Sequence, residues 1–285
     1  MPNQDLRSPY QTYVHRSWEP PPYEFSETPA SRLNSFFNAS MSYRMDAEFS
    51  APFGKFIKIK NHPEGAELDQ LIQNFGNNNI HLAVREGNGS LLAQMVSHCN
   101  TESGRENLTT MIETLLKVDV YGNCGPLKCI KNGELDCNEL VGRTNKMYLA
   151  FENSICKDYV TEKVFKMLPY NIIPIVFNGA RMSDVAPTHS YINVMDYGSV
   201  RELVDDIKRI ADDDALFASY FWWRDYYQFQ VNITDSLFIT FCLHILCRQQ
   251  LNPGVLQCAS CVKLFTKKKA KQETSKILKC CQTLN

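Results

Sequence analysis

The polar residues with the clearest chemical potential gather in one stretch, residues 148–177. Lys163 falls in the first turn of a predicted helix, where backbone amides and the helix dipole favour a phosphate and an ammonium adds a point charge. Glu162 beside it only accepts hydrogen bonds, which suits the vicinal hydroxyls of a ribose or another sugar. Glu152 and Asn153 add a carboxylate and an amide at the end of the preceding strand. Together these groups favour a ligand that carries both phosphate and sugar.

The elements that must position these groups form a strand, a polar loop, a helix and a second strand. Residues 149–151 are a short apolar run, residues 161–168 have helical spacing, and residues 172–177 are a β-branched run. This order predicts the βαβ unit of a doubly wound sheet. Such sheets bind ligands outside the carboxyl ends of their strands, which is where the polar loop lies.

A second βαβ unit precedes the first. Residues 91–97 and 118–121 have the composition of buried strands, and residues 103–116 have helical periodicity. Ser103 and Glu106 have the spacing of a capping box at the start of that helix. Arg105 therefore falls at a helix start, where anions bind. The alternative is an ordinary first-turn arginine in contact with solvent.

The usual motifs of nucleotide- and metal-binding sites are absent from the sequence or have a simpler explanation. The chain contains no Gly-x-Gly-x-x-Gly or P-loop sequence, so a sugar nucleotide fits better than a dinucleotide or a triphosphate. The alternative for Glu162 and Lys163 is a solvated pair on a capped helix. Residues 212–214 are three aspartates that resemble a metal-holding Asp-x-Asp motif, but their place between two helical patterns favours a helix cap. A helix is also predicted over residues 199–210, again from a capping box.

Cysteines and glycosylation sequons indicate the cellular compartment. The 285-residue chain has a net charge of −1, which gives no argument for a nucleic-acid partner, and it contains eleven cysteines. The spacing of Cys124, Cys129 and Cys137 does not match a zinc pattern and favours a disulfide. Four sequons favour a secretory-pathway protein over a cytosolic enzyme with unused sequons, and they begin at Asn38, Asn88, Asn107 and Asn232.

Targeting segments are not evident in this sequence. Residues 1–10 lack the apolar core of a signal peptide, and the apolar run 237–247 is shorter than the roughly 20 residues that a bilayer requires. Because a lumenal protein needs such a segment, we expect the chain to be a fragment or a short form without its membrane anchor.

Two motifs in residues 148–163 resemble the signature of the α1,3-fucosyltransferases. They are YLAFENS at residues 148–154 and DYVTEK at residues 158–163. Cys124-Gly-Pro-Leu-Lys-Cys129 is similar to the invertebrate members that modify the N-glycan core. Further matches lie elsewhere along the chain: Phe37-Asn38, Tyr43-Arg44-x-Asp46, Pro52-Phe53-Gly54, residues 118–122, 186–192 and 220–223.

The resemblance implies a fold and a division of the chain. The fold is α/β with two Rossmann-like domains that face a cleft, of the GT-B type, with the N-terminal domain largely missing. Residues 1–60 are then a remnant of the acceptor-side domain, and residues 61–90 are a linker or a surface excursion, as their Asn- and Gly-rich composition also indicates. Residues 91–245 bind GDP-fucose, and residues 246–285 are a tail rich in Cys and Lys.

The resemblance also assigns roles in the donor site. Arg105 and Lys163 are expected to hold the diphosphate of GDP-fucose. Tyr159 and Glu162 are expected to meet the ribose and neighbouring groups, and Asn153 to shape the donor pocket.

The expected reaction transfers fucose in α1,3 linkage to GlcNAc of glycoprotein N-glycans with inversion. Trp18-Glu19-Pro20 stands where the family has Glu-Ser-Pro, which makes Glu19 the candidate general base. No metal site and no cofactor are expected, with stimulation by Mn²⁺ left open. The implied location is the Golgi lumen or membrane, with membrane contact only through an anchor absent from this chain. The alternative is a truncated, inactive homologue that only binds nucleotide or glycoprotein.

Overall fold

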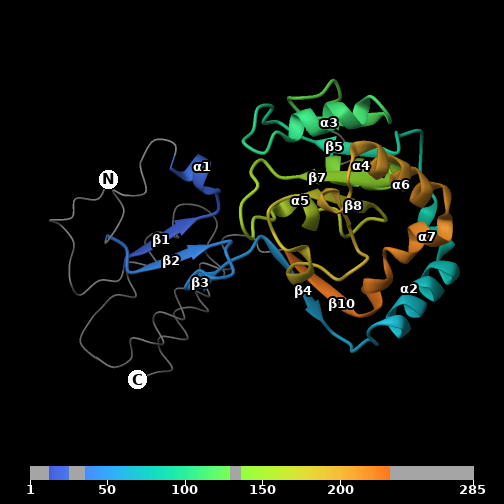
Figure 1. Cartoon of the computed structure of the whole chain (residues 1–285), viewed down its shortest axis with the longest axis horizontal. Helices are drawn as coiled ribbons and strands as arrows, with labels where there is room; N and C mark the ends of the chain where they lie inside the picture. The colour runs from blue at the N-terminus through green and yellow to red at the C-terminus, as the bar shows by residue number, and fades with distance from the viewer. Residues whose placement is uncertain (1–12, 26–35, 129–135, 232–285) are drawn as a thin grey trace. The chain divides into compact units, whose positions relative to one another are not determined.

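A five-stranded parallel sheet organises the protein (Figure 1). The computed structural model describes residues 13–25, 36–128 and 136–231. The order of the strands is β6-β5-β7-β8-β9, so the chain starts inside the sheet, moves to one edge and returns to build the other side. The strand bounds are β5 Leu92–Met95, β6 Val118–Tyr121, β7 Met147–Phe151, β8 Ile173–Phe177 and β9 Ile192–Asn193.

The central strand β7 is buried on both faces because its side chains alternate between two apolar clusters. Met147, Leu149 and Phe151 join the cluster on one face, whereas Tyr148 and Ala150 join the cluster on the other. All five side chains are at most 2% exposed. A strand buried on both faces is an uninterrupted apolar run in the sequence, which is why residues 149–151 were recognisable.

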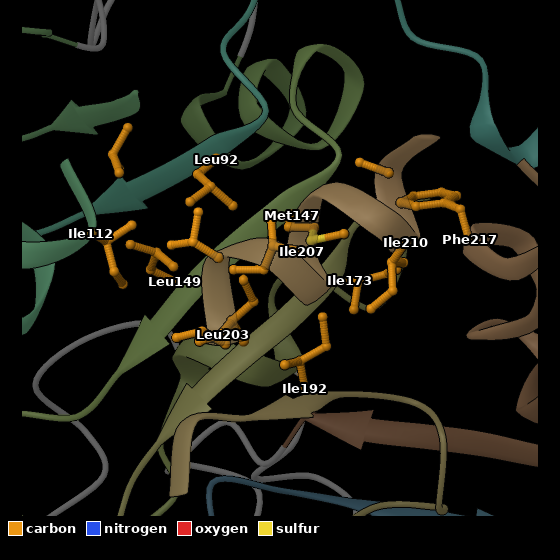
Figure 2. Close-up of a cluster of buried hydrophobic side chains, with 14 of the residues drawn as sticks. Leu92, Ile112, Met147, Leu149, Ile173, Ile192, Leu203, Ile207, Ile210 and Phe217 are labelled. Carbon is orange, nitrogen blue, oxygen red and sulfur yellow. The ribbon is translucent and has the colours of Figure 1, made fainter. Parts of the chain in front are cut away.

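Helices cover both faces of the sheet. The first cluster contains residues of α3 (Arg105–Glu113), α6 (Val200–Asp212) and α7 (Asp214–Ser219). Figure 2 shows Leu203, Ile207 and Ile210 of α6 packed over the strand residues Met147, Leu149 and Ile173.

The other face is covered by a second set of helices. The second cluster contains residues of α2 (Ala66–Asn78), α4 (Cys137–Thr144), α5 (Glu162–Phe165) and the 3₁₀ helix η6 (Trp222–Asp225). The result is a three-layer α/β/α arrangement.

Two smaller sheets complete the described residues. Strand β4 (Gly54–Lys58) pairs antiparallel with β10 (Tyr227–Val231). A three-stranded parallel sheet is formed by β1 (Val14–Ser17), β2 (Ala39–Ser42) and β3 (Phe49–Ser50). The short elements that remain are α1 (Pro21–Glu24), η3 (Ile80–Ala83), η4 (Met182–Asp184) and η5 (Val194–Asp196). No helix in the described ranges is long and apolar enough to cross a membrane.

Both predicted βαβ units are present, but one helix is much shorter than expected. The helix predicted over residues 161–168 is only Glu162–Phe165, and turns follow it through residue 169. Pro169 explains the early end, because it has no amide hydrogen to donate to the Phe165 carbonyl and its ring clashes with that carbonyl in a continuing helix. The expected strand from residue 190 to residue 195 is likewise reduced to β9, followed by η5.

Residues 61–90 are packed structure rather than the linker or surface excursion expected from their composition. They contain α2, whose Leu68 and Ile72 are buried, and η3 follows. Helices α2 and α7 lie side by side in Figure 1 and are in contact. Leu68, Ile72 and Phe75 have the i, i+4, i+7 spacing of an amphipathic helix, a signal that the surrounding asparagines and glycines masked.

The predicted helix caps had mixed outcomes. Ser199 caps α6 as expected, since its side chain accepts from the Glu202 amide at 3.2 Å. Asp213 caps α7 by accepting from the Leu216 amide at 2.9 Å, which confirms the cap interpretation of the three aspartates. The capping box predicted at Ser103 is wrong, because the N-cap of α3 is Gly104 in left-handed conformation.

Other predictions fall outside the described residues. They concern Cys129, the sequon at Asn232, the apolar run 237–247 and the tail 246–285.

Candidate functional site

Two loops meet where the direction of the sheet's connections reverses. The β5–α3 loop (residues 96–104) follows β5, and the β7–α5 loop (residues 152–161) follows the neighbouring strand β7. The chain leaves these two strands toward opposite edges of the sheet, which makes the region outside their carboxyl ends a topological switch point, and we call this region the crevice. In doubly wound folds this is the position at which ligands bind.

Hydrogen bonds join the β5–α3 loop and the β7–α5 loop, and we call these joined loops the floor of the crevice. Ser103 donates its amide to the Asn153 carbonyl at 3.0 Å and its hydroxyl to the Glu152 carbonyl at 2.7 Å. Arg105 spans the same junction, because Nη1 donates to the Phe151 carbonyl at 2.9 Å and Nη2 donates to the His98 carbonyl at 3.0 Å. The crevice is therefore preorganised by backbone contacts.

Arg105 is buried, at 5% exposure, rather than solvated in a first helical turn. Burial lowers the pKa of its guanidinium, and the nearby Glu152 carboxylate opposes that effect. Its Nε is buried and has no hydrogen-bond partner among the described residues, and the same holds for Asn153 Oδ1 and Ser154 Oγ. Because buried polar atoms are normally paired, three such atoms at this edge favour a polar ligand as their partner.

Glu152 is the buried anchor of the site. Its carboxylate is fully buried and accepts hydrogen bonds from the Thr161 amide at 2.8 Å and from the Thr161 hydroxyl. Lys163 Nζ lies 2.7 Å from Glu152 Oε2 and 2.7 Å from Thr161 Oγ1. An ammonium has three hydrogens, and these contacts use two of them. Since the Lys163 side chain is 19% exposed, its remaining hydrogen is available to an anion in the crevice.

Tyr159 and Glu162, the two residues expected near the ribose, differ in exposure. The Tyr159 side chain is 3% exposed, and burial, with the nearby carboxylates of Glu152 and Glu19, raises the pKa of its phenol. The phenol is therefore uncharged at neutral pH and can donate a hydrogen bond. Glu162 is more open, with a side chain 38% exposed and 4.0 Å from Lys166 Nζ.

Glu19 is an exposed residue between β1 and α1. It belongs to the wall of a hollow of about 260 Å³, whose other lining residues come mostly from the ends of β1 and β2 and the segment after β2. Its backbone is held by Ser17, whose hydroxyl lies 3.2 Å from both the amide and the carbonyl of Glu19. The Glu19 carboxylate is one of the charges that raise the pKa of Tyr159, after burial and Glu152.

A disulfide between Cys99 and Cys124 fixes the β5–α3 loop. It links that loop to the segment that follows β6, across 25 residues of sequence. Cys137 is disulfide-bonded as well. A disulfide in this region was predicted, but Cys99 was not among the cysteines considered. Among the described residues, no group of His, Cys, Asp or Glu side chains is arranged to hold a metal ion.

Comparison with known proteins identifies the family. The family described as "Glycosyltransferase family 10 (fucosyltransferase) C-term" matches residues 86–280, more than half of the chain, and "Fucosyltransferase, N-terminal" matches residues 1–54. This chain belongs to glycosyltransferase family 10. The resemblance seen in residues 148–163 is confirmed.

Two insect relatives are similar to this family 10 chain. Alpha-(1,3)-fucosyltransferase C of Drosophila melanogaster is 37% identical over 238 residues, which are 78% of this chain and 52% of the relative. Glycoprotein 3-alpha-L-fucosyltransferase A of the same organism is 35% identical over 191 residues, 66% of this chain and 35% of the relative. The chain thus spans about half or less of the length of these relatives.

A solved structure supports the family 10 fold. The crystal structure of an alpha1,3-fucosyltransferase with GDP-fucose has a TM-score of 0.52 and 17% sequence identity, and the match covers 75% of this chain and 67% of that one. The predicted α/β architecture of GT-B type is confirmed by this likeness and by the parallel sheets.

The structure brings most of the predicted site residues of this family 10 chain together. Arg105 and Asn153 lie in the joined loops, and Lys163 is tied to that floor through Glu152. The charges of Glu152, Glu19 and Glu162 add to the effect of burial in raising the pKa of Tyr159.

Glu152 was noticed as a second carboxylate in the sequence but was not included among the predicted site residues. The feature of the sequence that could have identified Glu152 is a charged residue directly after a wholly apolar strand. That position becomes buried only when the following loop folds over it.

Proposed function

We propose that this chain transfers fucose from GDP-fucose in α1,3 linkage to GlcNAc of glycoprotein N-glycans, with inversion at the anomeric carbon. The observation that carries the proposal is the half-buried Lys163 ammonium held by Glu152 at the crevice of a family 10 fold. A fixed cation with one spare hydrogen fits the diphosphate of a sugar nucleotide.

The diphosphate would lie against Lys163. Charge builds on GDP as the bond to fucose breaks, and a cation already held in place stabilises that charge without reorganisation. Arg105 would contribute its unpartnered Nε–H and its positive charge, while its other nitrogens keep holding Phe151 and His98. The main role of Arg105 is therefore to hold together the two loops that form the floor.

The ribose and neighbouring hydroxyls would lie near Tyr159 and Glu162. The uncharged Tyr159 phenol donates a hydrogen bond, and the Glu162 carboxylate accepts one, so together they match a hydroxyl that does both. Asn153 Oδ1 is a buried acceptor without a partner among the described residues and would take a further donor from the ligand.

Glu19 would act as the general base. Its carboxylate would remove the proton of the acceptor hydroxyl as that oxygen attacks the anomeric carbon of fucose, while the bond from that carbon to GDP breaks on the opposite face. The position of Glu19 in the wall of a hollow, within electrostatic reach of Tyr159, supports this role.

Three further parts of the proposal concern the acceptor, the cellular location and the need for a metal ion. The similarity to a Drosophila relative named glycoprotein 3-alpha-L-fucosyltransferase A supports a glycoprotein acceptor. The Cys99–Cys124 disulfide and the exposed sequon residues Asn38, Asn88 and Asn107 support a Golgi location. We also propose that no metal is required, since Lys163 and Arg105 supply positive charge; transfer is then expected to persist in EDTA, and loss of transfer would contradict it.

A radiolabelled fucose assay tests the proposed function. The 285-residue chain and a form extended at its N-terminus are each incubated with GDP-[¹⁴C]fucose and a GlcNAc-terminated glycopeptide. We expect labelled product with an α1,3 linkage. Glu19→Gln is expected to lower kcat by about 10²–10⁴-fold while the affinity for GDP stays the same. Absence of product from both forms, with GDP still bound, would instead favour a homologue that binds nucleotide without transfer.

A further inference from the structure

Residues 43–46, which follow β2, contact the β7–α5 loop at three points, and we call them the brace. They include the Tyr43-Arg44-x-Asp46 motif, to which the proposed chemistry gives no role. The contacts join segments more than 100 residues apart in sequence, since Met45 and Asp158 are separated by 113 positions.

The first contact packs one aromatic ring against another. The Tyr43 and Tyr159 ring centroids are 4.8 Å apart at 61°, and both side chains are 3% exposed. Burial raises the pKa of Tyr43 to about 12 and also raises that of Tyr159, so both phenols are uncharged at neutral pH. The contact is therefore buried aromatic packing in an edge-to-face arrangement, which ring quadrupoles favour.

The second contact holds the backbone just before Tyr159. The Met45 amide donates to Asp158 Oδ2 at 3.1 Å. Asp158 has a φ of 63°, in the left-handed region that only glycine, asparagine and aspartate adopt readily. Because Asp158 directly precedes Tyr159, this backbone turn sets the direction in which the Tyr159 ring points.

The third contact is an ion pair that contributes less. Lys157 Nζ lies 3.0 Å from Asp46 Oδ2, and Arg44 binds both oxygens of Asp46 at 2.6 and 2.7 Å. The Asp46 side chain is 50% exposed and the Lys157 side chain is 63% exposed, so water screens the pair. Tyr43 and Asp158 therefore carry most of the connection.

The brace also lines the hollow that includes Glu19. Tyr43, Arg44 and Asp46 all belong to the lining of that hollow. One short segment thus forms part of the wall beside the candidate base and supports the loop that carries Tyr159.

We propose that the brace is a positioning element that holds Tyr159 and the β7–α5 loop in the orientation that binds the nucleotide. The proposal rests on the proposed function only in that the ligand used to detect it is GDP. Tyr43 and Asp158 act through Tyr159 and its backbone, so they are positioning residues rather than catalytic ones.

The test uses two disruptive variants, each with a conservative partner. Tyr43→Ala removes the buried ring, whereas Tyr43→Phe keeps it. Asp158→Gly permits the left-handed backbone but removes the acceptor for the Met45 amide, whereas Asp158→Asn keeps both. Glu48→Gln is a control in the same hollow, since the Glu48 side chain bonds to Ser40 and no bond joins it to the β7–α5 loop.

Two measurements are made on each folded variant. Titration with GDP is expected to show Kd raised about tenfold by Tyr43→Ala and Asp158→Gly and unchanged by the two conservative variants and Glu48→Gln. Hydrogen exchange of the ligand-free protein is expected to show amides of residues 152–161 exchanging about tenfold faster in the two disruptive variants only.

The outcomes separate this inference from the proposed function. Unchanged exchange in residues 152–161 of folded Tyr43→Ala and Asp158→Gly would overturn the positioning role, whatever GDP does. Absence of GDP binding by the unaltered chain would overturn the proposed function, while the exchange experiment would still decide on the brace. Faster exchange in the two disruptive variants, with normal exchange in the two conservative variants, supports the positioning role of the brace.

Discussion

The pair of Glu152 and Lys163 determines what the site can do at the scale of single residues. A fully buried carboxylate is costly unless it is paired and hydrogen-bonded, and here Thr161 and Lys163 meet that need together. The Lys163 side chain is still 19% exposed. Lys163 therefore has a role in stability beside its proposed role in binding, and a single substitution would affect both.

A double variant separates the two roles of Lys163. Lys163→Met is expected to lower the free energy of unfolding by about 3 kcal/mol, because it leaves a buried charge without its partner. Adding Glu152→Gln removes that charge and should restore part of the stability in a urea titration, while GDP affinity stays lost. Recovery of GDP affinity in the double variant would show that Lys163 does not contact the nucleotide.

Prediction from the sequence was least complete for the burial and the contacts of single residues. The position of Lys163 beside the crevice was foreseeable from the order of strand, loop and helix. The burial of Arg105 was not, because a first-turn arginine reaches solvent unless tertiary carbonyls such as those of Phe151 and His98 capture it. The central place of Glu152 depends on Thr161 and Lys163 folding over it, which neighbouring residues in the sequence do not reveal.

At the scale of elements, the shortness of α5 changes the physical argument for anion binding. A helix of four residues has too few aligned peptides for a strong macrodipole, so the proposed anion binding rests on the positive charge of Lys163 itself. The strands, by contrast, were predictable because their apolar runs stay buried on both faces of the sheet.

The Cys99–Cys124 disulfide is the strongest local constraint on the β5–α3 loop. Cys99→Ala combined with Cys124→Ala opens a link across 25 residues and is expected to lower the free energy of unfolding by about 3 kcal/mol. Thermal unfolding with and without reductant checks this expectation. If the double variant unfolds at the same temperature as the oxidised protein, the disulfide has no stabilising role.

His189 links the start of β9 to the end of α7 and makes stability depend on pH. Its ring stacks on Tyr220 with centroids 4.0 Å apart, and its Nε2 lies 2.7 Å from Ser219 Oγ. Burial lowers the pKa of His189 to about 4, against an opposing effect of Asp69 and a smaller lowering by Arg209. The folded protein thus holds this imidazole neutral, and unfolding lets it bind a proton.

The sign of the pH effect follows from that lowered pKa. The contribution of His189 to stability is fully present above its unfolded pKa near 6.5 and is lost as pH falls toward 4, by about 3 kcal/mol. His189→Asn, which tolerates the φ of 53° at this position, should lack that component in urea titrations at pH 7 and pH 4. An equal pH dependence of the free energy of unfolding in the unaltered protein and in His189→Asn would contradict this prediction.

At the scale of the whole molecule, the fold was more predictable than the division of the chain. The doubly wound sheet and the GT-B type followed from the strand and helix patterns and from the resemblance in residues 148–163, and the comparisons confirm them. The packing of α2 against α7 was missed because it depends on a helix at the far end of the sequence. The brace was missed for the same reason, since no local pattern shows that residues 43–46 meet residues 157–159.

Titration of the protein with GDP in a calorimeter tests the central claim most directly, because the claim is that the crevice at the ends of β5 and β7 binds the nucleotide through Lys163. We predict saturable binding with one GDP per chain, lost in the folded Glu152→Gln/Lys163→Met double variant. No saturable binding to the unaltered chain, or equal binding to the double variant, would contradict it.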